Sequence, residues 1–175
     1  VLTAISNIRD TSTSHDRTTI IEVMGRECGN IALYAGLAGG AEEVIVPERE
    51  FDINLLSRKI LLSANSGKLH SIIIKAEGVE IDSNKLVELI QERTGRETKL
   101  VVLSYLQRGG TPTMKDRILA TMCGAKAVEL LLEESQSKAI GTVNDEIVAY
   151  DLAEALEQEN VFNEEMYKLI EVLSK

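Results

Sequence analysis

The sequence has no tryptophan, and aromatic residues make up only 3% of its 175 residues. This scarcity argues against a surface that stacks nucleic-acid bases. Positive charge is also in deficit, because 28 Asp and Glu stand against 19 Lys and Arg and give a net charge of −9. Phosphate backbones demand a positive face, so we expect no nucleic-acid partner. Small phosphorylated ligands remain compatible with this charge, since they need only a few local cations.

Long apolar runs and clustered metal ligands are missing too. No window approaches the roughly eighteen apolar residues of a membrane span, and no signal peptide is recognisable, so we expect a cytoplasmic protein without a membrane partner. The cysteines, Cys28 and Cys123, and the histidines, His15 and His70, are isolated in the sequence. We therefore predict neither a disulfide nor a metal site. The start at Val1, without an initiator Met, leads us to expect a piece of a longer protein.

Short runs rich in Ile, Val and Thr alternate with longer, helix-like runs. The pattern predicts strands at 18–24, 44–46, 71–76 and 100–103, and strand or hairpin segments at 139–143 and 147–149 around the Asn144-Asp145 turn. It predicts helices at 29–38, 52–65, 82–93, 114–133, 151–158 and 164–174. This alternation implies an α/β fold, with a mostly parallel sheet covered by helices on both faces. In the absence of a linker or repeat, residues 1–175 are expected to form a single domain.

Ligands of such sheets bind where strands end and loops begin. Met24, Gly25 and Arg26 lie at such a point, between a predicted strand and a predicted helix. Gly25 permits close backbone approach, the helix N-terminus offers free N–H groups, and Arg26 adds a permanent charge with a planar fork suited to phosphate. An ordinary turn with a solvated arginine explains this tripeptide equally well.

Two further polar turns follow strands of the same sheet. Arg108 lies in the run Gln107 to Pro112, beside paired glycines, and Glu77-Gly78 directly follows an apolar strand. A carboxylate at position 77 suits sugar hydroxyls, although a salt-bridged surface glutamate is the simpler alternative for that residue alone. Because strand ends converge on one rim, the set indicates a site for an anion and a polyol.

Arg17 precedes the first predicted strand and therefore lies at the opposite end of that strand from Arg26. It is suited to a site in a neighbouring subunit, or it merely solvates the surface. The sequence shows no nucleophile–base pair with an orienting group and no glycine-rich loop for nucleotide phosphates. The residues alone therefore indicate a binding rim and no catalytic machinery.

At these residues the chain resembles the 6-phosphofructokinase family, specifically the C-terminal half of its subunit. The resemblance runs almost from end to end, and several long stretches match in order. They are Ile8 to Thr11, Ser14 to Arg17, Glu22 to Arg26, Gly36 to Glu42, Gly67 to Gly78, Thr94 to Thr98, and Gln107 to Pro112 with Asp116-Arg117. The family's N-terminal half, which carries the ATP loop, the magnesium-binding acid and the catalytic aspartates, has no counterpart in this sequence.

The resemblance implies binding of fructose 6-phosphate by Met24, Gly25, Arg26, Glu77 and Arg108, with Arg26 also stabilising the transferring phosphoryl group. It further implies that Arg17 reaches the sugar phosphate of a neighbouring subunit together with Lys99, which stands where the family usually has Arg. Tyr105 stands where the family usually has His. Both exchanges alter contacts to phosphate.

The resemblance also implies an allosteric site for ADP or phosphoenolpyruvate. Its residues would be Arg9, Gly40, Ala41, Glu42, Lys68, Leu69 and His70. Ser66 stands where an effector-binding Arg is usual, and Leu69 replaces a typically basic residue. With fewer cations facing a polyanion, we expect weak or altered regulation.

For the whole enzyme the resemblance implies a glycolytic homotetramer that uses ATP and magnesium. This chain by itself is expected to bind neither and to be inactive alone. Two alternatives stay open on the sequence: half of a pyrophosphate-dependent phosphofructokinase, and a non-catalytic module for sugar-phosphate or effector binding and oligomerisation.

Overall fold

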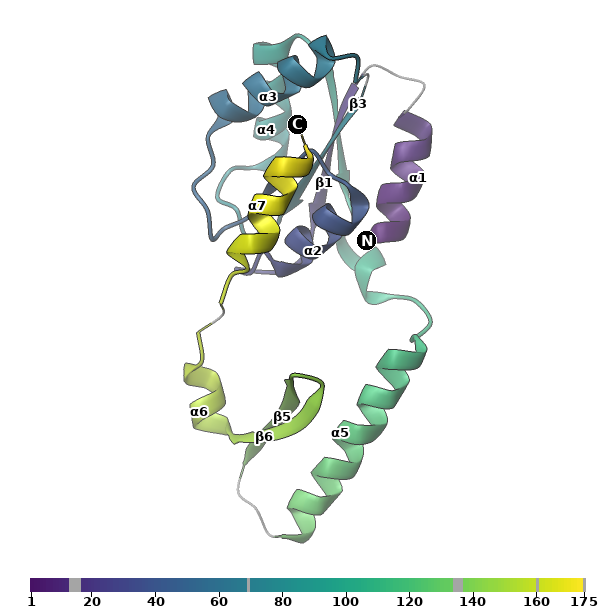
Figure 1. The fold of residues 1–175 in the computed structure, drawn as a ribbon, viewed down its shortest axis with the longest axis vertical. Coiled ribbons are helices and arrows are strands. Elements are labelled where there is room, and N and C mark those ends of the chain that lie inside the picture. The colour runs from purple at the N-terminus through teal and green to yellow at the C-terminus, as the bar shows by residue number, and fades with distance from the viewer. Residues whose placement is uncertain (13–16, 69, 134–136, 160, 175) are drawn as a thin grey trace. The chain divides into compact units, whose positions relative to one another are not determined.

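The computed structural model describes residues 1–12, 17–68, 70–133, 137–159 and 161–174. The chain forms two compact units, one of residues 1–109 and 161–175 and the other of residues 110–160 (Figure 1). The sequence predicts one domain over residues 1–175 and gives no sign of this division into two units. That domain assignment stays a prediction.

A four-stranded parallel sheet forms the centre of the first unit. Its strands are β1 (Arg17–Val23), β2 (Glu43–Ile45), β3 (His70–Ala76) and β4 (Glu97–Val102), in the order β2-β3-β1-β4. All neighbouring pairs are parallel, so the predicted mostly parallel α/β sheet is confirmed. Residues 71–76 of β3 are all buried, as expected of a central strand that is covered on both faces.

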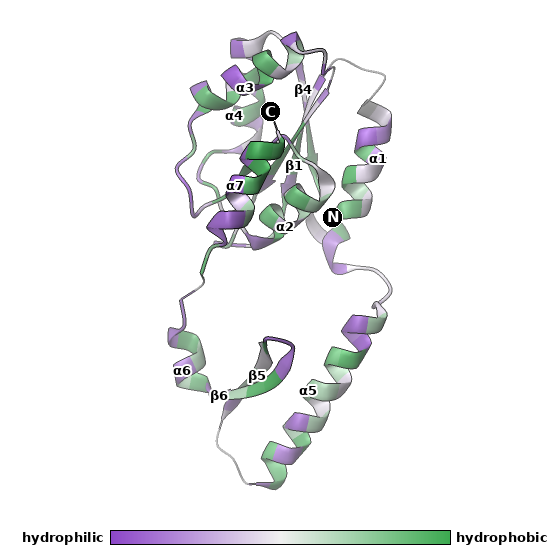
Figure 2. Cartoon of the chain, viewed as in Figure 1, coloured by the Kyte–Doolittle hydropathy of each residue, from purple (hydrophilic) through white to green (hydrophobic). Residues whose placement is uncertain are grey.

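Five helices cover the two faces of this sheet (Figure 1). They are α1 (Leu2–Ser12), α2 (Asn30–Gly39), α3 (Ile53–Asn65), α4 (Ser83–Thr94) and α7 (Glu164–Leu173). Successive strand residues point to opposite faces. Ile21 and Ile74 accordingly pack in one core with residues of α1, α2 and α7, and Ile20 and Ile73 pack in a second core with residues of α3 and α4. Figure 2 shows hydrophobic, green stretches on α2 and α7, two of the helices that cover this sheet.

Side-chain caps fix where the helices on the second face begin. The Asp52 carboxylate accepts hydrogen bonds from the N–H groups of Asn54 and Leu55 at the start of α3, and Asp82 caps α4 in the same way. Gly95 ends α4 in a left-handed conformation at φ 67°. These caps place α3 and α4 where helices were predicted, at 52–65 and 82–93.

The second unit holds α5 (Met114–Leu132), β5 (Lys138–Val143), β6 (Glu146–Asp151) and α6 (Leu152–Glu157). Thr113 and Asp116 form a reciprocal capping box at the start of α5. β5 and β6 pair antiparallel, and the turn residues Asn144 and Asp145 have φ values of 52° and 64°. The predicted hairpin at this turn is therefore confirmed. None of the described helices is both long and apolar enough to cross a membrane.

Candidate functional site

Three chain segments meet at the carboxyl end of β1. β3 and β4 flank β1 on either side, in parallel register. Beyond the last strand residues, the Glu77 N–H donates to the Val23 carbonyl at 2.9 Å, and the Leu103 N–H donates to the Glu22 carbonyl at 3.1 Å. The turns that follow the three strands are thereby brought to one edge, as the sequence predicts.

Side chains from both neighbouring turns hold the backbone of the Met24–Arg26 turn. The Glu77 Oε1 accepts hydrogen bonds from the N–H groups of Gly25 at 3.0 Å and of Arg26 at 2.7 Å. On the other side, the Gln107 Oε1 accepts from the Met24 N–H at 2.8 Å. These hydrogen bonds position the turn. The helix N-terminus that was expected to offer free N–H groups lies further along the chain, because α2 begins at Asn30. The sequence places Gln107 in the run from Gln107 to Pro112 but gives no sign of this contact with Met24.

Tight backbone approach requires glycine at two positions of this edge. A Cβ atom on Gly78 would lie 2.0 Å from the Arg26 carbonyl oxygen, and one on Gly25 would lie 2.4 Å from the Cys28 carbonyl oxygen. Arg26 itself has a left-handed backbone at φ 52°. The turn is thus pressed directly against the Glu77-Gly78 segment, and any side chain at Gly78 would separate the two.

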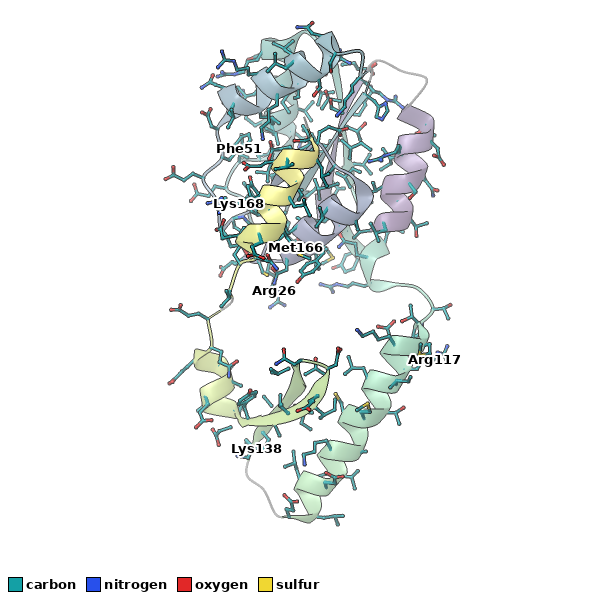
Figure 3. The ribbon with its side chains drawn as sticks, in the orientation of Figure 1. Arg26, Phe51, Arg117, Lys138, Met166 and Lys168 are labelled. Atoms are coloured by element: carbon teal, nitrogen blue, oxygen red, sulfur yellow. The ribbon has the colours of Figure 1, made fainter. Side chains whose placement is uncertain are left out.

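The charges of this edge favour an ionised carboxylate between cations. The backbone hydrogen bonds from Arg26 and Gly25 lower the pKa of Glu77 below its ordinary value of 4.5, and the positive charges of Arg108 and Arg26 lower it further. Glu77 is therefore an acceptor at neutral pH, able to orient hydroxyl groups. Figure 3 shows the Arg26 side chain extending away from the sheet.

Arg108 lies over an aromatic ring. It ends the short 3-10 helix η1 (Ser104–Arg108), and its Cζ lies 5.2 Å from the centroid of the Tyr105 ring. Tyr105 is 75% exposed, so this pair faces solvent. A guanidinium over a ring face is a cation–π contact, which restricts the arginine without consuming its hydrogen-bond donors. The edge therefore carries Arg26, Glu77 and Arg108 together, in an arrangement suited to an anion with hydroxyl groups.

Arg17 and Lys99 belong to another part of the unit. Arg17 begins β1 and is in register with His70 and Glu97, at the opposite end of the strand from Arg26, as predicted. Lys99, within β4, forms an exposed salt bridge with Glu97 at 2.8 Å. The structure of this unit therefore does not bring these two cations to the carboxyl edge.

The residues suggested for effector binding lie near the C-terminal end of α2 and the start of β3. The Arg9 guanidinium donates to the carbonyls of Gly39 and Gly40, the latter at 2.7 Å, and so caps α2. The Glu42 Oε2 accepts from the Ile72 N–H at 2.6 Å, and Ala41 is buried. Lys68 and His70 flank the start of β3, whereas Leu69, His15 and Asp16 lie outside the described residues.

A hollow borders the carboxyl edge. A hollow of about 670 Å³ is lined by residues 46–51 and 78–81, so it borders the Gly78 turn without including Arg26 or Arg108 in its lining. In the described ranges, no three His, Cys, Asp or Glu side chains gather so that they could hold a metal ion. The residues present at the edge thus suit an anion and a polyol.

Comparisons with known proteins agree with this fold. The family model described as phosphofructokinase matches residues 1–131. The chain is 54% identical to the ATP-dependent 6-phosphofructokinase of Alkaliphilus metalliredigens and 52% identical to that of Clostridium tetani, over 99% of this chain in both cases. It spans about half the length of these relatives, 54% of each.

A solved structure shows the same architecture. The phosphofructokinase of Saccharomyces cerevisiae superposes with a TM-score of 0.84 at 32% identity, over 89% of this chain and 22% of that one. The family model covers well over half of the residues, and the parallel sheet and its helices recur in this relative. The chain belongs to the phosphofructokinase family.

Proposed function

We propose that this chain supplies the fructose 6-phosphate-binding half of a 6-phosphofructokinase, which transfers the γ-phosphoryl group of ATP to the sugar 1-hydroxyl. The observation that carries the proposal is the convergence of Arg26, Glu77 and Arg108 at the carboxyl edge of the sheet, in a chain of this family. Carboxyl edges of parallel sheets are where ligands of such folds bind.

In this proposal each side chain has a distinct task. Glu77 uses the oxygen left by its backbone contacts to orient sugar hydroxyls, with Met24 and Gly25 lining the same turn. Arg108, with Tyr105 beneath it, holds an anionic group of the substrate. Arg26 is the catalytic residue of the chain, since a fixed cation at the edge stabilises the charge of the phosphoryl group in transfer.

The phosphoryl donor is proposed to bind outside this chain. Because this chain spans 54% of the length of its relatives, we place the residues for magnesium and ATP elsewhere in the enzyme and expect this chain to be inactive alone. ATP is preferred to pyrophosphate as donor because curated relatives at 54% and 52% identity carry the name ATP-dependent 6-phosphofructokinase. A glycolytic role in the cytoplasm belongs to the same proposal.

Oligomerisation follows from the positions of Arg17 and Lys99. Both lie away from Arg26 within their own unit. We therefore assign them to the phosphate of the sugar bound by a neighbouring subunit, in a homotetramer. Mixed oligomers test this assignment: Arg17→Ala subunits should restore activity to Arg108→Ala subunits, because each would supply what the other lacks. Mixtures no more active than either variant alone would contradict shared sites.

Effector binding is proposed at the other set of residues, around Arg9, Glu42 and His70. ADP and phosphoenolpyruvate are the proposed effectors, bound also by Gly40, Ala41, Lys68 and Leu69. The guanidinium of Arg9 already caps α2, so its charge is held in place but part of its donor capacity is used. This supports a site of reduced affinity.

Calorimetry of the complete gene product with fructose 6-phosphate tests the central proposal. We expect saturable binding that Arg108→Ala weakens, and turnover when ATP and magnesium are added. Lys126→Ala, which removes a cation of the second unit, is the matched control and should bind as the wild type does. No binding at millimolar sugar phosphate would overturn the proposal, and binding without turnover would favour the non-catalytic module.

A further inference from the structure

An ion pair between a buried lysine and a partly buried glutamate, 22% exposed, lies near the ends of β3 and β1, next to two turns of the candidate site. Lys75 of β3 is 2% exposed, and its Nζ lies 3.5 Å from the Glu22 Oε2 of β1. The two residues are direct partners in the parallel register of β1 and β3. Ser83, in the first turn of α4, donates its hydroxyl to the same Glu22 oxygen. The cluster therefore joins two strands and a helix at one point.

Each member of the ion pair is two residues from a turn of the site. Lys75 is two residues before Glu77, and Glu22 is two residues before Met24. The backbone of Glu22 also anchors the third segment, since its carbonyl accepts from the Leu103 N–H. A shift at the pair would thus be passed to all three segments of the carboxyl edge within a few bonds.

The edge tolerates little displacement. Glu77 reaches the N–H groups of Gly25 and Arg26 at 3.0 and 2.7 Å, and Gly78 leaves no room for even a Cβ atom beside the Arg26 carbonyl. Hydrogen bonds weaken steeply when such geometry is lost. The distance between the Met24–Arg26 turn and the Glu77-Gly78 turn must therefore be fixed by the strand residues that precede these turns.

A contribution to folding stability does not explain well why this ion pair is present. Well-packed hydrophobic residues in place of a buried ion pair are often neutral or stabilising, because removing two charges from water is costly. The surrounding core of Ile20, Ile45 and Ile73 could accept an apolar side chain at position 75. An apolar residue at position 75 could not bind the Glu22 carboxylate, which also accepts the Ser83 hydroxyl. It would therefore not fix the distance between β3 and Glu22.

We propose that Lys75 and Glu22 are positioning residues, which act through their ion pair to fix the Met24–Arg26 turn against Glu77 for sugar-phosphate binding. The inference rests on the proposed function of this edge. It assigns no contact with substrate to either residue. Their effect on the substrate passes through Glu77 and the backbone of Arg26.

The test compares KM for fructose 6-phosphate and KM for ATP in the complete gene product. Lys75→Met and Glu22→Gln each leave one charge without its opposite charge, and we expect each to raise the sugar-phosphate KM by about tenfold or more. The KM for ATP should stay within about twofold, because the effect is confined to this edge. The double variant should be about as impaired as either single variant, because each substitution already breaks the same pair.

Lys59→Met is the matched control. Lys59 forms an ion pair with Glu43 at 2.6 Å, between α3 and β2, away from the three turns. It should lower Tm without changing the sugar-phosphate KM. If Lys75→Met fails to fold, Glu22→Gln and the double variant carry the same comparison.

Three results would overturn the inference. The first is that the single variants resemble Lys59→Met, with lower Tm and unchanged KM, which would make the pair purely structural. The second is a double variant whose loss in binding free energy equals the sum of the two single losses, since the residues would then act independently of each other. The third is a wild-type protein without sugar-phosphate affinity, which would overturn the proposed function as well. Wild-type affinity with unaffected variants would overturn this inference alone.

Discussion

The carboxylate of Glu77 holds the backbone of Arg26, with 2.7 Å between the Oε1 of the first residue and the N–H nitrogen of the second. The same oxygen accepts from Gly25. A residue expected to orient sugar hydroxyls thus also shapes the turn that carries the neighbouring arginine. Substrate binding and turn geometry are linked through one side chain.

Glu77→Gln should therefore weaken fructose 6-phosphate binding more than the loss of one hydroxyl contact would. The amide oxygen still accepts hydrogen bonds, but without the charge that strengthens them, and we expect Kd to rise by about tenfold. Calorimetry on the complete gene product measures the change. Glu80→Gln, which alters an exposed glutamate of the same loop, is the control and should leave Kd unchanged.

The low pKa of Glu77 sets the pH window of this effect. Because the folded pKa lies below 4.5, the contribution of the carboxylate is fully present above pH 4.5 and is lost only as pH falls through the lower folded value. The ratio of wild-type to Glu77→Gln affinity should therefore be constant between pH 5 and 8. A ratio that already falls within that range would contradict the assignment.

Gly78→Ala should disrupt the same edge by steric means. The new Cβ would lie 2.0 Å from the Arg26 carbonyl oxygen, which belongs to the backbone and can yield only if the turn moves. We expect a loss of about 1–3 kcal/mol in stability and weaker sugar-phosphate binding. Thermal unfolding and calorimetry measure the two effects.

Gly124→Ala serves as the comparison for this substitution. A Cβ at position 124 of α5 would meet nothing within 4 Å, and alanine favours helix over glycine by about 1 kcal/mol. The control should be neutral or slightly stabilising, with unchanged affinity. If Gly78→Ala and Gly124→Ala had the same stability and the same sugar-phosphate affinity, the close approach at Gly78 would not matter for binding.

The ring of Tyr105 should matter more than its hydroxyl. Arg108 lies over the ring face, and a cation–π contact at an exposed site contributes about 0.5–1 kcal/mol. Tyr105→Leu should therefore weaken sugar-phosphate binding by about two- to fivefold, whereas Tyr105→Phe should bind as the wild type does. Equal losses in both variants would show that the phenol oxygen contacts the substrate directly.

The fold was predictable where local rules decide it. Runs of β-branched residues predicted the parallel strands. The helices predicted at 52–65 and 82–93 begin at the local caps Asp52 and Asp82, which act within a few residues of their own positions. The helix α1 was not predicted. Its apolar face rests mainly on Ile5, which is 1% exposed, and on Ile8, too few positions to establish a helical period.

The residues that make up the site were predictable from the sequence, but the contacts that hold its turns together were not. Strand ends converge in any parallel sheet, so Arg26, Glu77 and Arg108 could be grouped from the sequence. The hydrogen bond from Met24 to Gln107 joins residues 83 positions apart, and no local pattern encodes it. The partner of Lys75 likewise follows from the register between β1 and β3, which the tertiary structure alone supplies.

Effector control should be weak and should respond to one added cation. Ser66 follows α3, near Lys68, and is exposed. Ser66→Arg should tighten ADP or phosphoenolpyruvate binding by about tenfold, as expected when a charge-assisted hydrogen bond is added to a polyanion. Effector titrations of the complete gene product measure this gain. Asn65→Arg adds the same charge one residue away and should increase effector affinity less. If the wild type already showed ordinary regulation by ADP and phosphoenolpyruvate, the expectation of a weak site would be contradicted.

Alkaline pH should loosen α7 through Tyr167. Burial, reinforced by the negative charge of Glu43, raises the pKa of Tyr167 from 10.0 to about 12. A raised folded pKa gives stability that is fully present below pH 10 and is lost as pH rises toward 12, because the unfolded chain releases the proton first. Tyr167→Phe cannot ionise, so its Tm should fall less steeply above pH 10, while the Tm difference between variant and wild type stays constant from pH 7 to 9. Parallel Tm profiles up to pH 11.5 would refute this assignment.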